Sequence, residues 1–147
     1  MTRYASKSRV LPTKSRDEIE KLVVAYGATG YLSGWDDETN RAFVQFRMEA
    51  RVIKLTTRLP QLADPGLTTV AKFEQARRSH WRAMVLLVKA KLEAVASGIV
   101  TFEEEFFPHV VMPDGGTVYE RAAANVAIAY ETGKPVALLP DHGKGSR

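Results

Sequence analysis

The feature that most constrains the fold is a helical pattern that extends over residues 69–97. Gly98 followed by Ile99 predicts a Schellman termination with its hydrophobic partner. A helix of this length spans roughly 40 Å, so we expect it to form the spine of a single domain. Apolar residues recur at helical spacing on the side that we expect to face the core. They are Phe73, Trp81, Met84, Leu87, Val88, Leu92 and Val95.

Shorter patterns predict the elements on either side of this helix. A capping box from Ser15 to Glu18 opens a first helix with an apolar side of Ile19, Leu22, Val23 and Tyr26. Strands are expected over residues 29–35, 41–48 and 51–59. Two further capping boxes predict a short helix that Pro108 ends and a last helix to about residue 132; they are Thr101 with Glu104 and Thr117 with Glu120.

The order of these elements defines the expected fold class. It is α+β, with an N-terminal helix, a three-stranded antiparallel meander, one long central helix and two shorter C-terminal helices. Residues 1–14 are expected to form a basic N-terminal arm, residues 15–140 a single domain and residues 141–147 a disordered tail. The junction Glu49-Ala50 has poor turn chemistry, so a long bent strand with a bulge stays open as an alternative there.

Motifs for chemistry are missing from the sequence. The chain has no cysteine, its three histidines are scattered, and it contains neither a GxGxxG nor a GxxxxGK[ST] motif. We therefore expect a non-enzymatic protein with no catalytic residues, no metal and no cofactor. The longest apolar run, residues 83–88, is far shorter than the ~20 residues of a membrane helix, which leads us to expect a cytoplasmic protein without a membrane partner.

Positive charge is concentrated toward the N-terminus. Residues 1–58 hold eleven Lys and Arg against seven acids, whereas residues 99–147 hold four against seven. The first sixteen residues contain five basic side chains and no acid. Such an arm is typical of a segment that contacts polyanions, although a solubilising disordered end has the same composition.

Strand alternation predicts an aromatic and basic surface. If Leu32, Val44, Phe46, Ile53 and Leu55 face the core, the opposite face presents aromatic and basic side chains together. The third strand is expected to need a bulge to satisfy this pattern. Exposed aromatics beside cations are how sheets hold single-stranded nucleic acid, while burial under helices or in a homodimer is the ordinary alternative. The expected outer residues are Tyr31, Ser33, Trp35, Arg41, Phe43, Gln45, Arg47, Lys54 and Arg58.

The long helix presents a second basic surface. Arg78, Arg82 and Lys89 lie within about 40° of one another on a helical wheel, away from the apolar side, and form what we call the basic ridge. A solvated helix face is the ordinary reading of such a ridge. Arg77, His80 and Lys91 instead project into the apolar side. They either lift their charged ends to its edge or, if covered, pair with the acidic run 103–105.

The segment from His80 to Glu120 resembles a group of small non-virion proteins of tailed bacteriophages and prophages, and the similarity extends over about residues 15–140. The resemblance implies a phage accessory protein acting in the bacterial host cell, without assigning site residues. The order helix, three strands, helix is also similar in topology to the double-stranded-RNA-binding domain. However, the segment TTVAKFEQARR lacks the lysine cluster that domain carries at the start of its second helix.

Two functions are expected from these features. The first is binding of nucleic acid, single-stranded in preference to double-stranded, through the aromatic and basic sheet surface and the basic ridge. The alternative is a protein-binding inhibitor of a host process, such as an anti-phage defence system. The sequence also leaves a homodimer open. The residues expected to bind nucleic acid are Tyr31, Trp35, Arg41, Phe43, Arg47, Lys54, Arg58, Arg78, Arg82 and Lys89.

Overall fold

The computed structural model describes residues 13–36 and 38–139. It confirms the α+β class, with a three-stranded antiparallel sheet in the order β1-β2-β3. The last two residues of the expected arm, Thr13 and Lys14, are helical, whereas the rest of the arm and the tail 141–147 lie outside the described residues. The elements are α2 (Thr13–Ala25), β1 (Gly30–Asp36), β2 (Arg41–Met48), β3 (Arg51–Arg58), α3 (Val70–Ala96), α4 (Phe102–Phe106), the 3-10 helix η1 (Phe107–His109) and α5 (Val118–Thr132).

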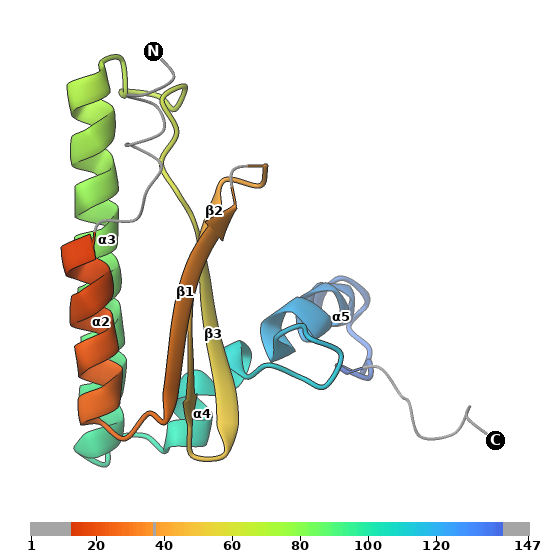
Figure 1. Cartoon of the computed structure of the whole chain (residues 1–147). Helices are drawn as coiled ribbons and strands as arrows, with labels where there is room; N and C mark the ends of the chain where they lie inside the picture. The colour runs from red at the N-terminus through yellow and green to blue at the C-terminus, as the bar shows by residue number, and fades with distance from the viewer. Residues whose placement is uncertain (1–12, 37, 140–147) are drawn as a thin grey trace.

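Two helices cover one face of the sheet. Helices α2 and α3 lie side by side on that face, while α5 stands off the opposite side (Figure 1). The core between helices and sheet contains the fully buried Trp81 of α3, Ile19 of α2 and Phe46 of β2. Phe106 of α4 closes the lower end of this core by an edge-to-face contact with Phe46 at 5.8 Å. Among the described residues no helix is both long and apolar enough to span a membrane.

The long helix is confirmed within one residue at each end. The Lys72 backbone N–H donates to the Thr69 hydroxyl at its start, and Gly98 adopts φ +81° after its last turn. Hydrogen bonds from Gly98 N–H to the Val95 carbonyl and from Ile99 N–H to the Ala94 carbonyl form the predicted Schellman motif. Its hydrophobic partner is nonetheless not covered, because Ile99 is 78% exposed.

Two other helix predictions were wrong. Helix α2 begins at Thr13, so Ser15 lies inside it and does not open a capping box. Leu87 is 44% exposed, whereas Val85 takes a core position on α3. The buried residues of α3 centre on Val88, and Leu87 projects about 100° away from Val88 around the helix axis. The capping boxes at Thr101 and Thr117 are confirmed.

The second hairpin is tight and regular. Met48 pairs with Arg51 across the two-residue turn Glu49-Ala50. Both turn residues have positive φ, 53° and 60°, which is the backbone of the inverted turns that join twisted antiparallel strands. Pairing then continues without interruption to Arg41 and Arg58, so the expected bulge in the third strand is wrong.

The predicted orientation of β1 is reversed. Tyr31 pairs with Phe46 and Trp35 with Ala42, so both aromatics share the face of the buried residues of β2. Leu32 pairs with Gln45 on the opposite face and is 48% exposed. Sequence alternation correctly placed Leu32 and Trp35 on different faces but assigned each to the wrong one. Trp35 is nevertheless 42% exposed, because it lies near the open end of edge strand β1.

Helix α5 is attached to the rest of the chain through its first turn. The Val118 N–H donates to the Val110 carbonyl, and Val111 donates to the Val52 carbonyl at the edge of β3. An ion pair of 2.7 Å joins Arg121 to Asp114 in the preceding turn. Val118 is the one buried residue of α5, so the remainder of the helix depends little on the core.

Candidate nucleic-acid interface

The predicted aromatic and basic sheet surface is divided between two faces. Tyr31 and Trp35 lie on the helix side, where the Tyr31 hydroxyl donates to the Arg16 carbonyl of α2 at 3.4 Å. Burial raises the pKa of Tyr31. The five remaining sheet residues share the face turned away from α2 and α3, which we call the outer face: Arg41, Phe43, Arg47, Lys54 and Arg58.

An aromatic ring lies at the middle of the outer face. Phe43 on the central strand is half-buried and reaches across to Gly34 on β1, while the Lys54 ammonium of β3 stands 4.9 Å from the ring centroid. A cation at this distance is attracted by the ring, by about 0.5–1 kcal/mol at an exposed site. The ring thus keeps part of its surface in solvent and lies next to one cation, Lys54.

Three cations of the outer face have no acidic partner among the residues that the structure describes. Within the described residues, none of Arg41, Arg47 and Lys54 forms an ion pair. Arg58 differs, because its guanidinium contacts the Asp64 carboxylate at 2.8 Å. This contact lowers the pKa of Asp64 and neutralises Arg58 locally. The unneutralised charge of the outer face therefore follows β2 and β3 on both sides of Phe43.

A cleft of about 610 Å³ separates the outer face from α5. Of its eight lining residues the sequence predicted two, Arg41 and Lys54. The six that it missed include Tyr119, which is 64% exposed, and the half-buried His109. Burial and the nearby Lys91 charge lower the pKa of His109, so its ring is neutral at pH 7. No sequence pattern links these residues to the sheet, because isolated pairing of Val110 and Val111 with β3 brings them there. The cleft is lined by Arg41, Lys54, Thr56, Pro108, His109, Thr117, Tyr119 and Glu120.

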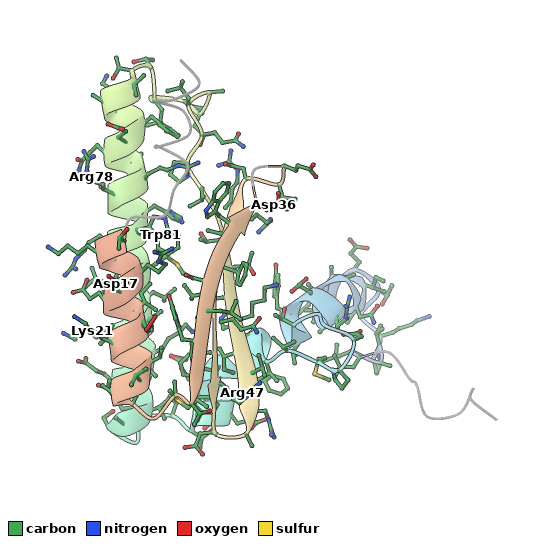
Figure 2. All side chains as sticks on the ribbon, in the orientation of Figure 1. Asp17, Lys21, Asp36, Arg47, Arg78 and Trp81 are labelled. Atoms are coloured by element: carbon green, nitrogen blue, oxygen red, sulfur yellow. The ribbon has the colours of Figure 1, made fainter. Side chains whose placement is uncertain are left out.

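The basic ridge lies on the other side of the molecule. Figure 2 shows Arg78 projecting from α3 away from the sheet, on the side opposite the outer face that carries Arg47. Arg78 donates to Gln75, and Arg82 forms a 2.8 Å ion pair with Glu18 of α2. Two of the three ridge cations are thereby partly satisfied within the chain. A groove of about 830 Å³ between α2 and α3 is lined by Lys14, Ser15, Glu18, Gln75, Arg78, Ser79, Arg82, Ala83 and Leu86.

A buried polar network ties α3 to the open end of the sheet. Arg77 is only 7% exposed and donates to the Pro60 carbonyl at 3.3 Å and the Asn40 side-chain oxygen at 3.4 Å. One turn later, His80 Nε2 lies 2.7 Å from the Thr57 hydroxyl. Burial, and to a lesser extent the Arg77 charge, lowers the pKa of His80. These residues hold the loop after β3 against the helix.

The expected pairing of covered cations with the acidic run 103–105 holds for only one of them. Lys91 lies 3.9 Å from the Glu105 carboxylate and 5.7 Å from the Phe106 ring centroid. Arg77 does not pair with this run, because it lies near the opposite end of α3 and is satisfied by loop oxygens. Lys91 and Arg77 therefore serve the packing of α3.

Comparison of the chain with protein-family models, curated protein sequences and solved structures gives no match. In the part of the chain that the structure describes, no group of three or more His, Asp or Glu side chains is placed to hold a metal ion. The two basic surfaces are therefore the features of the molecule that point to a function.

Proposed function

We propose that the protein binds single-stranded nucleic acid on the outer face, without catalysing a reaction on it. The observation that carries the proposal is the position of Phe43 between Arg41, Arg47 and Lys54, which lack acidic partners within the described residues. The resemblance to phage proteins supports an accessory role in the host cytoplasm.

The chemistry of the surface favours a single strand over a duplex. A base can stack on Phe43 only when its face is exposed, and duplex stacking hides both faces of every base. The Lys54 ammonium, which now lies over the ring, would then move aside and contact a phosphate of the same strand.

Fluorescence anisotropy with labelled single-stranded and double-stranded oligonucleotides tests this proposal. We expect binding of the single strand at low salt that weakens steeply as salt is added, because bound phosphates release counterions. Changing Arg41, Arg47 and Lys54 together to Gln should reduce the slope of log affinity against log salt by roughly two units, at about 0.7 per lost phosphate contact.

The basic ridge offers a control of equal charge. Changing Arg78, Arg82 and Lys89 together to Gln removes the same three charges from the opposite side of the molecule. We expect this variant to keep most of the wild-type affinity and slope. An equal loss of affinity in the two triple variants would show that the nucleic acid is attracted to net charge alone, and this would contradict the proposal.

A second candidate function is supported by the groove between α2 and α3. It combines Lys14, Arg78 and Arg82 with the exposed apolar side chain of Leu86, which is 54% exposed. Basic and apolar side chains in one interhelical groove suit an acidic amphipathic helix of a host protein. Capture from nuclease-treated host lysate tests it: a stoichiometric protein retained by the wild type and lost with Arg78→Glu supports an inhibitor.

A further inference from the structure

Helix α5 is apolar on most of its surface yet barely packed. Ten of its fifteen residues are Ala, Val, Ile or Tyr, and only Val118 is buried. Tyr130 is 87% exposed, and Val126 and Ile128 are 39% and 43% exposed. A helix of this length is marginal in water unless a partner covers its apolar side. The helix also stands clear of the layer formed by α2 and α3 (Figure 1).

Three exposed side chains and the half-buried Ala123 form a seam along α5. Tyr119, Ala123, Val126 and Tyr130 follow one another at intervals of four, three and four residues, the spacing of helices that pack in pairs. The middle of this seam is small, because alanine occupies position 123. A small residue there lets a second helix approach closely. We call these four residues the α5 seam.

We propose that the α5 seam binds the α5 seam of a second copy of this chain, with the two helices antiparallel. A two-fold axis at the middle of the seam places each Tyr119 opposite Tyr130 of the other copy and each Ala123 opposite Val126. Apolar side chains then meet apolar side chains at every position. A self-complementary seam of this kind needs no other protein.

The helix dipoles favour the antiparallel orientation. In an antiparallel pair the positive N-terminal end of each α5 lies beside the negative C-terminal end of the other, whereas a parallel pair places like ends together.

The area of the seam predicts a dimer that dissociates on dilution. A tyrosine buries about 150–250 Å² when fully covered, so the two exposed tyrosines and their smaller neighbours offer roughly 500 Å² per copy. The pair would bury about 1,000 Å² in total, near the lower limit for a specific interface. Such an interface binds weakly enough for the monomer to appear in dilute solution.

Size-exclusion chromatography with light scattering, over a range of protein concentrations, tests the dimer. We expect a dimer at high concentration that dissociates on dilution. Tyr130→Glu should weaken dimerisation at least about tenfold, because a carboxylate is placed in an apolar contact twice. Ala124→Glu, on the same helix but off the seam, should dimerise as the wild type does. Circular dichroism would confirm that both variants fold.

Cross-linking tests the orientation, because the chain contains no cysteine of its own. Copies carrying Ala123→Cys are mixed with copies carrying Val126→Cys and oxidised. We expect disulfides between the two kinds of copy in preference to those within either kind. A monomer at all concentrations, equal dimerisation of Tyr130→Glu and the wild type, or a preference for the 123–123 disulfide would each overturn the proposal.

Discussion

The ring of Phe43 lies directly over Gly34 on the neighbouring strand. A Cβ atom at position 34 would stand 2.7 Å from the Cε1 atom of the ring and 3.0 Å from Cζ. These residues are register partners in the β1–β2 ladder, so the missing side chain of one provides the space for the other. Glycine at this position thus allows an aromatic ring to lie flat across the outer face.

Replacement of this glycine should destabilise the protein. Gly34→Ala forces Phe43 off its position, and we expect the free energy of unfolding to fall by about 1–2 kcal/mol, as for other overpacked sites. Urea denaturation measures the change. Gly30→Ala on the same strand is the control, because an added Cβ atom there meets no atom within 4 Å. Equal effects of the two substitutions would show that the ring moves aside freely.

Removal of the ring should weaken binding of the single strand. We expect Phe43→Ala to cost about 1–3 kcal/mol of binding free energy, the range for one stacked base, with little change in salt dependence. Trp35→Ala is the control, because Trp35 is exposed but lies on the helix side of the sheet. Anisotropy titrations compare the variants. A larger loss from Trp35→Ala would place the strand on the helix side instead.

The sequence was sufficient for the order of the elements and for most of their limits, the start of α2 excepted, because caps and turns are local. Thr69, Thr101 and Thr117 each mark a helix start through a hydrogen bond to a backbone N–H three residues later. The faces of β1 could not be predicted in this way. Tyr31, Leu32 and Trp35 put apolar side chains on both faces, and pairing with β2 decides which face is covered.

The candidate site was predictable only where it lies on regular strands. The alternation of β2 and β3 correctly grouped Arg41, Phe43 and Lys54 on one face. The far wall of the cleft depends on the path of the turn before α5, so Tyr119 carried no signal. Arg58 was grouped correctly, but sequence alone did not reveal that Asp64 in the next loop neutralises it.

Stability should decline as the pH falls below about 6.5, the ordinary pKa of histidine. The pKa of folded His80 is lowered, so the unfolded chain takes up the proton first and gains stability relative to the folded state. The contribution of neutral His80 to the free energy of unfolding is complete above pH 6.5 and is lost as the pH falls through the folded-state pKa. We expect His80→Gln, which preserves a polar partner for Thr57, to flatten this decline between pH 7.5 and 5 in urea titrations.

Part of the decline should remain in this variant, because the pKa of His109 is lowered in the same direction. His109→Gln combined with His80→Gln should flatten it further. An unchanged slope in the double variant would show that neither ring resists protonation in the folded state.

Glycine at the second hairpin should stabilise the protein. Ala50 adopts φ +60°, where an L-residue with a side chain is strained by roughly 1–2 kcal/mol. We expect Ala50→Gly to raise the free energy of unfolding by about 0.5–1 kcal/mol, since glycine also gains freedom in the unfolded chain. The same change in exposed Ala90 of α3 should lower it by about 1 kcal/mol. A decrease at both positions would contradict the turn conformation.

Loss of the cap on α5 should open this helix alone. The Thr117 hydroxyl accepts a hydrogen bond from the Glu120 N–H, and the Glu120 carboxylate accepts one from the Thr117 N–H. We expect Thr117→Ala to cost about 1 kcal/mol and to speed amide hydrogen exchange in α5 several-fold in dilute protein. Exchange in α3 should stay unchanged, because α5 contributes one buried residue to the core.

Thr101→Ala is the comparison: it removes the same cap from α4, whose Phe106 is fully buried, and should lower the stability of the whole domain. Faster exchange throughout α3 in Thr117→Ala would mean that α5 unfolds with the core and not separately from it.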